Sequence, residues 1–184
     1  MDSTDRAIYL DAINGDRDAF ETIIRGSSRT LFAIAYGVLQ NRAEAEDVVQ
    51  DAFVKAWKSR WRVRVPEKFP AWLATIARNR AHDVARSRRM DEPLVDQFAE
   101  VADEVSKFQD EQAREAYLGT RVHCALAALP ETHRIALTLR YFDALDYATI
   151  EQTLGLTNGA LRGILGRALQ TMRKRLQPVL ASME

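Results

Sequence analysis

The chain is poor in cysteine, and its few histidines are far apart in the sequence. Among 184 residues there is a single cysteine, Cys124, which excludes an internal disulfide. The three histidines are His82, His123 and His133, and no set of Cys and His residues has the spacing of a zinc site. We therefore expect neither a bound metal nor any other cofactor.

Long apolar runs are also missing. The longest, residues 31–39, falls far short of the ~18 residues that a membrane-spanning helix requires. The first five residues, Met1 to Asp5, are acidic where a secretion signal would be basic. These two absences predict a protein without membrane insertion and with a cytoplasmic location.

Proline and glycine, the residues that most often interrupt regular structure, are scarce, with 5 and 8 copies respectively. No segment alternates polar and apolar residues as a half-buried strand does. Both observations predict an all-α fold. The apolar periodicity and the helix-capping residues Asp16, Asn41 and Asp146 predict helices at about 5–13, 17–39 (with a kink near 26–28), 42–60, 70–89, 116–129, 131–142, 147–154 and 158–176.

An excess of one charge is missing as well, because 26 Lys and Arg balance 26 Asp and Glu. A net charge of zero argues against nucleic acid as a partner, since domains that bind nucleic acid are usually basic. The distribution along the chain argues the other way. The net charge is −4 in residues 1–50, +8 in 51–90, −7 in 91–118, −1 in 119–156 and +4 in 157–184. Two separate basic blocks indicate contact with a polyanion at two places, and solvated helix faces are the alternative.

The predicted helices at 42–60 and 70–89 each have one apolar face, to which Trp57 and Trp72 belong. In the second helix, Arg80 falls near the apolar side and is expected to serve structure. Four other side chains of that helix recur at spacings of 4, 4 and 3 residues and form one stripe directed away from the core: Arg78, His82, Arg86 and Arg89.

The two last predicted helices are separated by a tight turn that contains Gly155. A short helix, a turn of a few residues and a second helix form the pattern of a helix-turn-helix, which a plain helical hairpin shares. In the second of these helices, Leu161, Leu165 and Ala168 lie on the predicted core side.

Three stretches resemble one known family. Residues 42–57 (RAEAEDVVQDAFVKAW) are similar to the helix with which bacterial sigma factors bind core RNA polymerase. Residues 69–83 (FPAWLATIARNRAHD) resemble their promoter-melting helix, and residues 127–156 resemble their second domain through the segments AALP, ALTLRYF and YATI with LGL. The resemblance extends from Asp11 to Leu176. The size and layout are similar to the small extracytoplasmic-function (ECF) group of the sigma-70 family.

The resemblance implies two small helical domains joined by a flexible acidic linker. Sigma region 2 would occupy residues 1–92, the linker 93–115 and sigma region 4 residues 116–184. Region 2 would bind core RNA polymerase and melt the −10 element of promoter DNA, and region 4 would recognise the −35 element. Sigma factors of this group are typically held inactive by an anti-sigma protein, which is therefore a further expected partner.

The resemblance also implies the residues that carry these roles. The core-binding residues would be Asp47, Gln50, Asp51 and Lys55. The −10 residues would be Trp61, Arg62, Arg64, Lys68, Arg78, Asn79, His82, Arg86 and Arg89. The −35 residues would be Asn158, Arg162, Arg167, Gln170 and Arg173. Packing is an alternative role for Trp61, and an internal ion pair is expected for Asp83.

The last helix departs from the family pattern. Where the family commonly has Thr-Val-Lys-Ser-Arg-Leu-His-Arg-Ala, residues 160–168 read Ala-Leu-Arg-Gly-Ile-Leu-Gly-Arg-Ala. Gly163 and Gly166 each lower helix propensity by ~1 kcal/mol relative to Ala. This departure puts the −35 specificity in question more than the fold.

Other functions are open at this point. A sigma mimic that sequesters an anti-sigma protein without reading DNA is favoured by the altered last helix and opposed by the intact basic helix at 70–89. A helix-turn-helix repressor that binds duplex DNA alone leaves the pattern at 47–57 without a purpose. An enzyme is the least supported class, because no paired carboxylates, nucleophile with a base, or phosphate loop can be assigned. The acidic linker has one further possible role, as the occupant of a basic channel.

Overall fold

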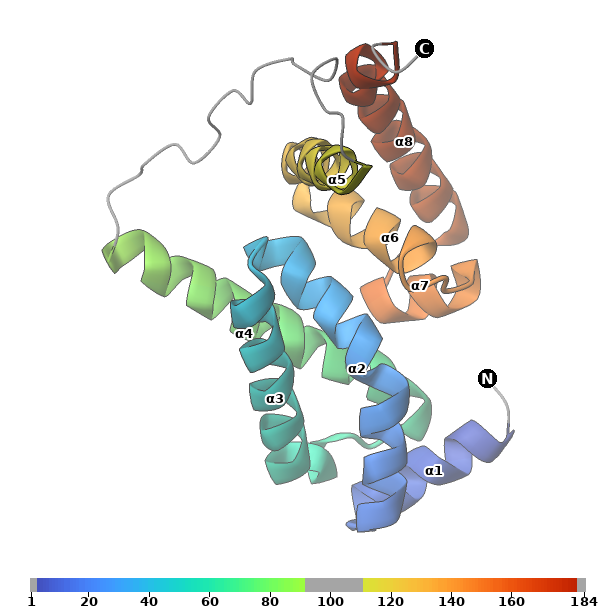
Figure 1. Ribbon diagram of the computed structural model, residues 1–184. Coiled ribbons are helices and arrows are strands. Elements are labelled where there is room, and N and C mark those ends of the chain that lie inside the picture. Colours follow the sequence, from blue (N-terminus) through green and yellow to red (C-terminus); the bar gives the residue numbers. More distant parts are fainter. Residues whose placement is uncertain (1–2, 92–110, 182–184) are drawn as a thin grey trace.

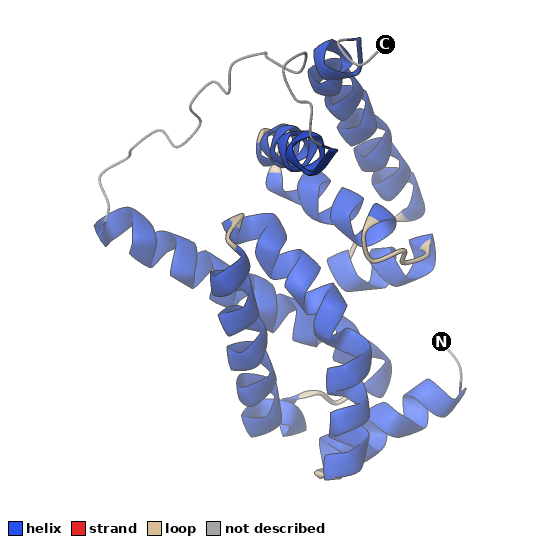
Figure 2. Ribbon diagram, in the orientation of Figure 1, coloured by secondary structure: helices blue, strands red, loops and turns tan. Residues whose placement is uncertain are grey.

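The protein is an assembly of α-helices, as expected from its scarcity of proline and glycine and its lack of alternating segments. The computed structural model describes residues 3–91 and 111–181 (Figure 1). Within these residues the regular elements are α-helices and two short 3-10 turns, and Figure 2 shows no strand in them. The all-α prediction is therefore confirmed.

The helices form an N-terminal and a C-terminal domain. The N-terminal domain holds α1 (Ser3–Asn14), α2 (Arg17–Leu39), α3 (Arg42–Ser59), the 3-10 turns η1 (Arg60–Arg62) and η2 (Pro66–Lys68), and α4 (Phe69–Asp91). The C-terminal domain holds α5 (Glu111–Ala127), α6 (Glu131–Tyr141), α7 (Tyr147–Leu154) and α8 (Asn158–Ala181). Helix α5 thus begins within the segment that the sequence assigned to the linker. The rest of that segment, up to residue 110, lies outside the described residues.

Capping side chains start the helices where the sequence predicted. Asp16 accepts a hydrogen bond from the amide of Ala19 at 2.8 Å, and Asn41 accepts one from Glu44 at 3.1 Å. Each bond satisfies an amide that has no partner within its helix, which stabilises a helix start by about 1 kcal/mol. Between α2 and α3, Gln40 adopts φ 54°, so the chain reverses within two residues.

Helix α2 includes residues 26–28, where the sequence suggested a possible kink. The helix continues through this segment without interruption. The hydroxyl of Ser28 donates to the carbonyl of Ile24 at 2.5 Å. A serine that bonds back to its own helix in this way often bends the helix without ending it.

The N-terminal domain packs α2, α3 and α4 around two buried clusters. Phe20, Phe53 and Phe69, one from each helix, belong to the larger one. Phe69 is fully buried, and burying such a ring contributes about 1.5–3 kcal/mol. Trp57 and Trp72 are half-buried and pack against this cluster, as predicted. This packing leaves the opposite faces of α3 and α4 available for other contacts.

The C-terminal domain has a separate cluster that extends into the N-terminal domain. Its members include Ile135 of α6, Ile150 of α7 and Leu161 of α8, all of them fully buried. Ala33 and Ile34 of α2 belong to the same cluster, together with Ala74 of α4. The two helical domains are present as expected, and in addition they share a core.

Gly37 of α2 is the residue that allows this close packing. A Cβ atom at this position would lie only 2.6 Å from Cγ1 of Ile135 on α6. Because real Cβ atoms do not approach another carbon so closely, a side chain here would force the two helices apart. The backbone carbonyl of Gly37 also accepts a hydrogen bond from the guanidinium of Arg134, which joins the two domains directly.

Candidate functional site

Helix α3 presents the four polar residues that the sequence assigned to polymerase binding. Asp47, Gln50, Asp51 and Lys55 are all exposed, while Val48 and Ala52 between them are buried. Their spacing of three and four residues places them on one side of the helix. Asp51 has an internal partner, because Arg80 of α4 pairs with it at 2.8 Å.

Arg80 therefore has a structural role, as the sequence suggested, but through an ion pair with Asp51 and not along the apolar side of α4. It is exposed and reaches across to α3. Since both side chains of this pair are about half exposed, water screens their attraction, and the pair contributes about 0–1 kcal/mol. Such a pair can exchange for contacts with a partner protein.

The loop between α3 and α4 exposes an aromatic ring among cations. Trp61 is 64% exposed, which favours a binding role over the packing role that was the alternative for it. The nearby cations of the predicted −10 set are exposed as well: Arg62, Arg64 and Lys68. An exposed indole beside cations has the chemistry of a site where a nucleic-acid base stacks and phosphates are neutralised.

An ion pair that the sequence did not reveal orders this loop. Arg6 of α1 donates to Glu67 of η2 at 2.5 Å. A backbone amide bond and this Arg6 contact lower the pKa of Glu67. A second cation, Arg60, stacks over the ring of Trp57 with 4.1 Å between guanidinium carbon and ring centroid. Both contacts hold 3-10 turns against the domain and leave Trp61 pointing into solvent.

The predicted basic stripe of α4 is divided into a covered and an open part. Arg78 pairs with Glu131 of α6 at 2.8 Å, and the Nε2 atom of His82 lies 3.3 Å from the same carboxylate oxygen. The sequence placed these two side chains away from the core of their own domain, and in the structure they face the C-terminal domain. The helical spacing placed them correctly relative to their own domain, but the C-terminal domain packs over that side.

The open part of the stripe comprises Asn79 and Arg86, which are exposed. Arg86 lies 3.8 Å from Asp83, which thus has the ion pair expected for it, although a loose one between two exposed groups. Arg89 lies within α4, and its side chain is outside the described part of the chain. The cations of this helix consequently differ in how accessible they are to a ligand.

The C-terminal pair α7 and α8 has the geometry of a helix-turn-helix. Asp146 caps α7 by accepting from the amide of Thr149 at 2.8 Å, and these backbone bonds are the main cause of its lowered pKa. Gly155 ends α7 with φ 66°, a conformation that glycine adopts without strain. Thr157 then accepts from the amide of Ala160 at 3.4 Å and is the weak cap of α8.

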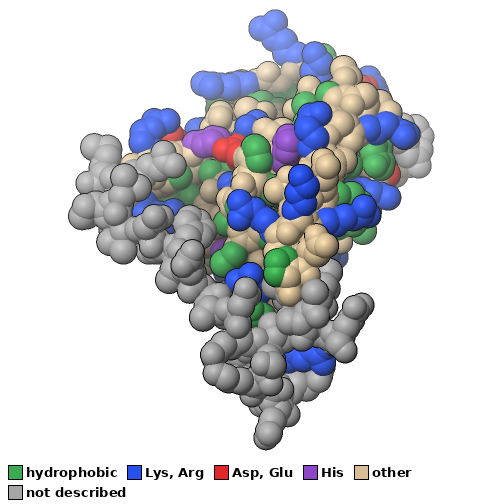
Figure 3. Space-filling view, turned by 90° about the horizontal axis from the view of Figure 1, so that it is seen from above, with side chains coloured by type: hydrophobic (Ala, Val, Ile, Leu, Met, Phe, Trp, Pro, Cys, Tyr) green, Lys and Arg blue, Asp and Glu red, His purple; other side chains and the backbone are tan. Residues whose placement is uncertain are grey.

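Helix α8 has a buried and an exposed face, as predicted. Leu161, Leu165 and Ala168 are buried. The five residues of the predicted −35 set are exposed: Asn158, Arg162, Arg167, Gln170 and Arg173. Figure 3, which looks down on the end of the molecule where α5 and α8 lie, shows a face on which Lys and Arg side chains predominate over Asp and Glu.

The first turn of α8 is ordered by a chain of polar contacts. The side-chain amide nitrogen of Asn158 donates to the carboxylate of Glu151 on α7 at 2.5 Å. Arg162 donates to the side-chain oxygen of Asn158 at 2.8 Å. The guanidinium of Arg162 also lies over the ring of Tyr147, 5.4 Å from its centroid. These contacts fix the direction of the Arg162 head group before any ligand arrives.

The two unusual glycines of α8 have different surroundings. A Cβ at Gly163 would lie 3.3 Å from Nη1 of Arg167, so the missing side chain leaves room for that guanidinium along the helix. A Cβ at Gly166 would meet nothing within 4 Å. Arg167 also lies close enough to His133 of α6 to lower its pKa, although burial of the imidazole is the larger cause.

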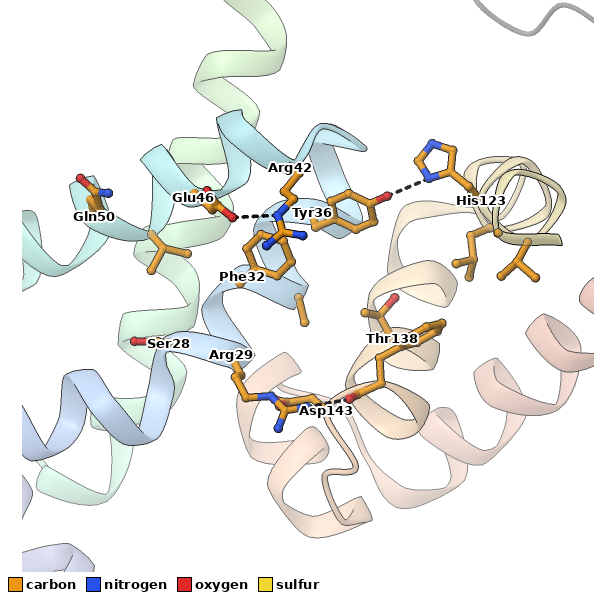
Figure 4. A pocket seen from close by; sticks show the side chains of 16 residues that line it. Ser28, Arg29, Phe32, Tyr36, Arg42, Glu46, Gln50, His123, Thr138 and Asp143 are labelled. Carbon is orange, nitrogen blue, oxygen red and sulfur yellow. Dashed lines mark hydrogen bonds and ion pairs between the residues drawn. The ribbon is translucent and has the colours of Figure 1, made fainter. Parts of the chain in front are cut away.

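A groove that the sequence did not predict lies between the two domains. It has a volume of about 850 Å³ and is lined by residues of α2, α3, α5 and α6 (Figure 4). Phe32 and Tyr36 of α2 form one apolar wall, and Val122 and Leu126 of α5 contribute the other. Phe142 lies at its edge and is 57% exposed.

Charged and polar pairs surround this apolar groove. Arg42 pairs with Glu46 at 2.9 Å on the α3 side, and Arg29 pairs with Asp143 at 3.3 Å on the α6 side. Tyr36 shares a hydrogen bond of 2.8 Å with Nδ1 of His123 (Figure 4). Burial raises the pKa of the Tyr36 phenol. An apolar floor with charged edges is the usual form of a surface that accepts an amphipathic helix.

Two further features are absent from residues 3–91 and 111–181. These residues contain no cluster of three or more His, Cys, Asp or Glu side chains able to hold a metal ion. None of the described helices has the length and apolar character needed to cross a membrane.

Two family models match this chain, one in each of its two domains. Residues 23–90 match the model described as Sigma-70 region 2, and residues 119–177 match Sigma-70, region 4. The structure is similar to that of CnrH in complex with the cytosolic domain of CnrY, with a TM-score of 0.67, 25% identity and coverage of 94% of this chain and 97% of that one.

Comparison with curated proteins agrees. The chain is 32% identical to the RNA polymerase sigma-H factor of Pseudomonas aeruginosa over 174 residues, covering 90% of each protein. It is 28% identical to the ECF RNA polymerase sigma factor SigW of Bacillus subtilis, covering 89% of this chain and 91% of that protein. The chain therefore belongs to the extracytoplasmic-function group of the sigma-70 family of RNA polymerase sigma factors.

Proposed function

We propose that this protein binds core RNA polymerase through α3, opens the −10 element with α4 and the Trp61 loop, and recognises the −35 element with α8. It acts in the cytoplasm, as a regulatory subunit without catalytic residues of its own. The observation that carries the proposal is that one chain exposes a polar α3 face, an aromatic and cationic loop, and a helix-turn-helix whose outer face is basic.

Polymerase binding is assigned to the exposed face of α3. Asp47, Gln50 and Lys55 offer an acceptor, an amide and a cation within two helical turns, and α3 itself is held rigidly by Val48 and Ala52 in the core. Asp51 joins this surface when Arg80 releases it. A rigid helix lowers the entropy lost on binding, because its side chains are already arranged.

Melting of the −10 element is assigned to the loop and the open part of α4. Unstacking a base costs a few kcal/mol, and stacking it on an aromatic ring returns about 1–3 kcal/mol. Trp61 provides such a ring, and Arg62 and Arg64 beside it neutralise phosphates of the separated strand. Asn79 on α4 is placed to contact a base edge.

Recognition of the −35 element is assigned to α8. In a helix-turn-helix, the second helix lies in the major groove and its first residues contact the bases. Here those residues are Asn158 and Arg162, which form a hydrogen-bonded pair. Arg167, Gln170 and Arg173 follow on the exposed face and contact phosphates. The orientation of Arg162 by Tyr147 and Asn158 compensates for the residues that the family pattern has and this helix lacks.

The partner that holds the protein inactive is an anti-sigma protein, and its binding site is the groove between the domains. CnrH is itself described in complex with the cytosolic domain of CnrY. The apolar floor of the groove fits the apolar face of a partner helix, and the ion pairs Arg42–Glu46 and Arg29–Asp143 at its edges offer both charges to polar residues of that helix.

Reconstituted transcription tests the proposal. Purified protein is added to core RNA polymerase with a library of promoter fragments, and the transcript starts are sequenced. We expect starts downstream of a shared pair of elements, and loss of those starts with Asp47→Ala combined with Gln50→Ala, which removes core binding. Tight binding of an anti-sigma protein without any transcript, and without binding to core polymerase, would support the sigma mimic instead.

A further inference from the structure

The first half of α8 offers few polar side chains to DNA. Leu161, Ile164 and Leu165 are buried in the core of the C-terminal domain. Apart from Asn158 and Arg162, the remaining positions up to residue 166 hold glycine or alanine: Gly159, Ala160, Gly163 and Gly166. Because neither glycine nor alanine has a hydrogen-bonding side chain, Asn158 and Arg162 are the two residues of this stretch whose side chains can form hydrogen bonds with a base.

Asn158 is held by charged neighbours on both of its polar side-chain atoms. Its Nδ2 donates to Oε1 of Glu151 on α7 at 2.5 Å, and its Oδ1 accepts from Nε of Arg162 at 2.8 Å. The reversed amide would set an oxygen against the carboxylate and an N–H against the guanidinium, so these two neighbours fix its orientation. Asparagine recognises adenine with the same oxygen and nitrogen. To form that pair, Asn158 would have to turn its amide and lose bonds to two charged groups.

Arg162, in contrast, keeps the groups that recognise guanine. Its side chain is exposed, its Nε bonds to Asn158, and its guanidinium lies over the ring of Tyr147, 5.4 Å from the centroid. Within the residues that the structure describes, no hydrogen bond engages its terminal nitrogens, Nη1 and Nη2. Two N–H groups at one end of a guanidinium match the O6 and N7 acceptors that guanine presents in the major groove.

The ring of Tyr147 is held in turn by the end of α6. The guanidinium of Arg140 lies 5.3 Å from the centroid of this ring. Nη1 of Arg140 donates to the carbonyl of Leu145 at 2.8 Å, which ties this cation to the turn before α7. Residues of α6, α7 and α8 therefore position Arg162 together. A side chain that is already oriented loses less conformational entropy when it binds a ligand.

We propose that Arg162 recognises a guanine in the −35 element, and that Glu151 and Asn158 are positioning residues that orient its guanidinium and do not themselves pair with a base. The assignment rests on the proposed function of α8 and narrows it, because of the two polar residues at the start of α8 Arg162 alone then sets a base preference. It also gives a role in promoter recognition to Glu151, a residue of α7 outside the predicted −35 set.

Reconstituted transcription from a promoter with a randomised −35 element tests the proposal. The promoter is one recovered with the parent protein and core RNA polymerase, its −10 element is kept, and each template carries a transcribed barcode. The quantity measured is the ratio among the four bases at each −35 position in the templates that yield transcripts. A uniform change in affinity or in folded protein affects all templates alike, so this ratio reports base recognition alone.

Arg162→Ala removes the guanidinium. In the parent we expect one position of the element to prefer guanine by about 5- to 150-fold, and in the variant this preference should disappear. Arg162→Lys keeps the charge without the paired N–H groups, so it should restore the amount of transcript more than the preference. Arg167→Ala is the matched comparison, because loss of a phosphate contact should weaken all templates alike. A parent without a guanine preference, or an Arg162→Ala protein that retains it, would overturn the proposal.

Asn158→Ala separates positioning from direct recognition of a base. If Asn158 orients Arg162, the variant should weaken the guanine preference by about 2- to 10-fold, the effect of one lost hydrogen bond, and change no other position. If Asn158 itself pairs with a base, the variant loses the preference at a second position and keeps the guanine preference intact. That second result would contradict the proposal.

Glu151 is tested by two substitutions that differ in one hydrogen bond. Glu151→Gln removes the charge but keeps an oxygen that accepts from Asn158, so most of the guanine preference should remain. Glu151→Ala removes both and should weaken the preference as Asn158→Ala does. The control is Gln152→Ala, at the exposed next position of α7, which should match the parent. Base ratios in Glu151→Ala equal to those of the parent would mean that Glu151 has no positioning role.

Failure of this proposal is distinguishable from failure of the proposed function. If the parent protein starts transcription at a shared promoter but no −35 position shows a guanine preference that depends on Arg162, the function stands and the guanine assignment is wrong. If the parent protein neither binds core polymerase nor yields transcripts from any template, the proposed function fails, and the assignment of Arg162 to the −35 element fails with it.

Discussion

The two basic helices of this protein, α4 and α8, have similar patterns of apolar and basic residues but different surroundings. Both bury an apolar stripe and both carry Arg residues on the opposite side. On α8 the predicted DNA contacts are all exposed, and Arg162 is oriented by neighbours of its own domain. On α4, Arg78 and His82 are in contact with Glu131 of the other domain.

This difference shows that a basic stripe on a helix is not always accessible to DNA. Helical periodicity locates a side chain relative to the core of its own helix bundle. It contains no information about a second domain that packs over the stripe. We therefore expect duplex binding by α8 to be independent of the domain arrangement, and binding by α4 to depend on it.

The largest effect is expected from the core of the C-terminal domain. Leu161→Ala empties a fully buried position, which should lower the free energy of unfolding by about 2–5 kcal/mol. Because Leu161 shares its cluster with Ile34 of α2, faster amide hydrogen exchange should appear in α2 around Ile34 as well as in α5–α8.

Leu73→Ala is the matched variant, since Leu73 is just as buried but belongs to the other cluster. It should cost a similar free energy and loosen α2–α4 without reaching α7. If Leu161→Ala left α2 fully protected, the shared core would be of no energetic importance, and the two domains would behave as independent units.

The next effect concerns the exposed indole of the N-terminal domain. Trp61→Ala should weaken promoter opening by about 1–3 kcal/mol, or roughly 5- to 150-fold, because the base loses its stacking surface. Fluorescence of 2-aminopurine in the −10 element measures the opening. Trp61→Phe should retain most of it, and neither variant should alter −35 duplex binding. A large loss of thermal stability in Trp61→Ala would instead indicate a packing role.

A smaller effect is expected at the glycines of α8. Gly166→Ala should raise stability by about 1 kcal/mol, since a Cβ there meets nothing within 4 Å and alanine is the better helix former. Gly163→Ala should gain less, because its Cβ would press on the guanidinium of Arg167. Thermal unfolding measures the first difference.

The effect of the Gly163 substitution on Arg167 is measured by duplex DNA binding as a function of salt. Displacement of Arg167 by Gly163→Ala should change the affinity and the salt dependence, while Gly166→Ala should leave both unchanged. Equal behaviour of the two variants would mean that the position of Arg167 along the helix has no part in DNA binding.

The smallest effect is a pH dependence of the helix-turn-helix. Hydrogen bonds from the start of α7 lower the pKa of Asp146 below its ordinary 3.8, so its carboxylate stabilises the folded state above that value. This stabilisation is lost as the pH falls through the lowered pKa. Asp146→Asn keeps an oxygen to cap α7 but does not titrate there. The melting temperatures of the two proteins should therefore converge or cross between about pH 5 and about pH 2. A constant difference would contradict this.

Much of the fold could be predicted from single residues and their spacing. Asp16, Asn41 and Asp146 cap helices as expected because a capping bond joins residues only three positions apart. The buried stripe of α8 and the turn at Gly155 follow from the same local rules. At residues 26–28, where the sequence suggested a kink, α2 continues as one helix.

The residues of the candidate site could be predicted from the sequence, but their contacts with residues of the other domain could not. The exposed α3 face, Trp61 and the outer face of α8 lie where the sequence placed them. The contact of Glu131 with Arg78 spans 53 residues, and that of Tyr36 with His123 spans 87. No periodic pattern encodes such pairs, because they depend on how two finished helix bundles meet.

The sequence by itself determined the helices, their caps, their buried stripes and the family, because these depend on interactions within a few residues and on motifs read in order. The tertiary structure alone decided that Gly37 lets α2 and α6 meet, that residues of α2, α3, α5 and α6 line a groove with apolar walls, and that Glu131 contacts part of the basic stripe. The physical reason is that burial and charge pairing between domains arise only once both surfaces exist. Some of the opposite charges that sum to zero in the sequence pair with each other between the domains, as Glu131 does with Arg78.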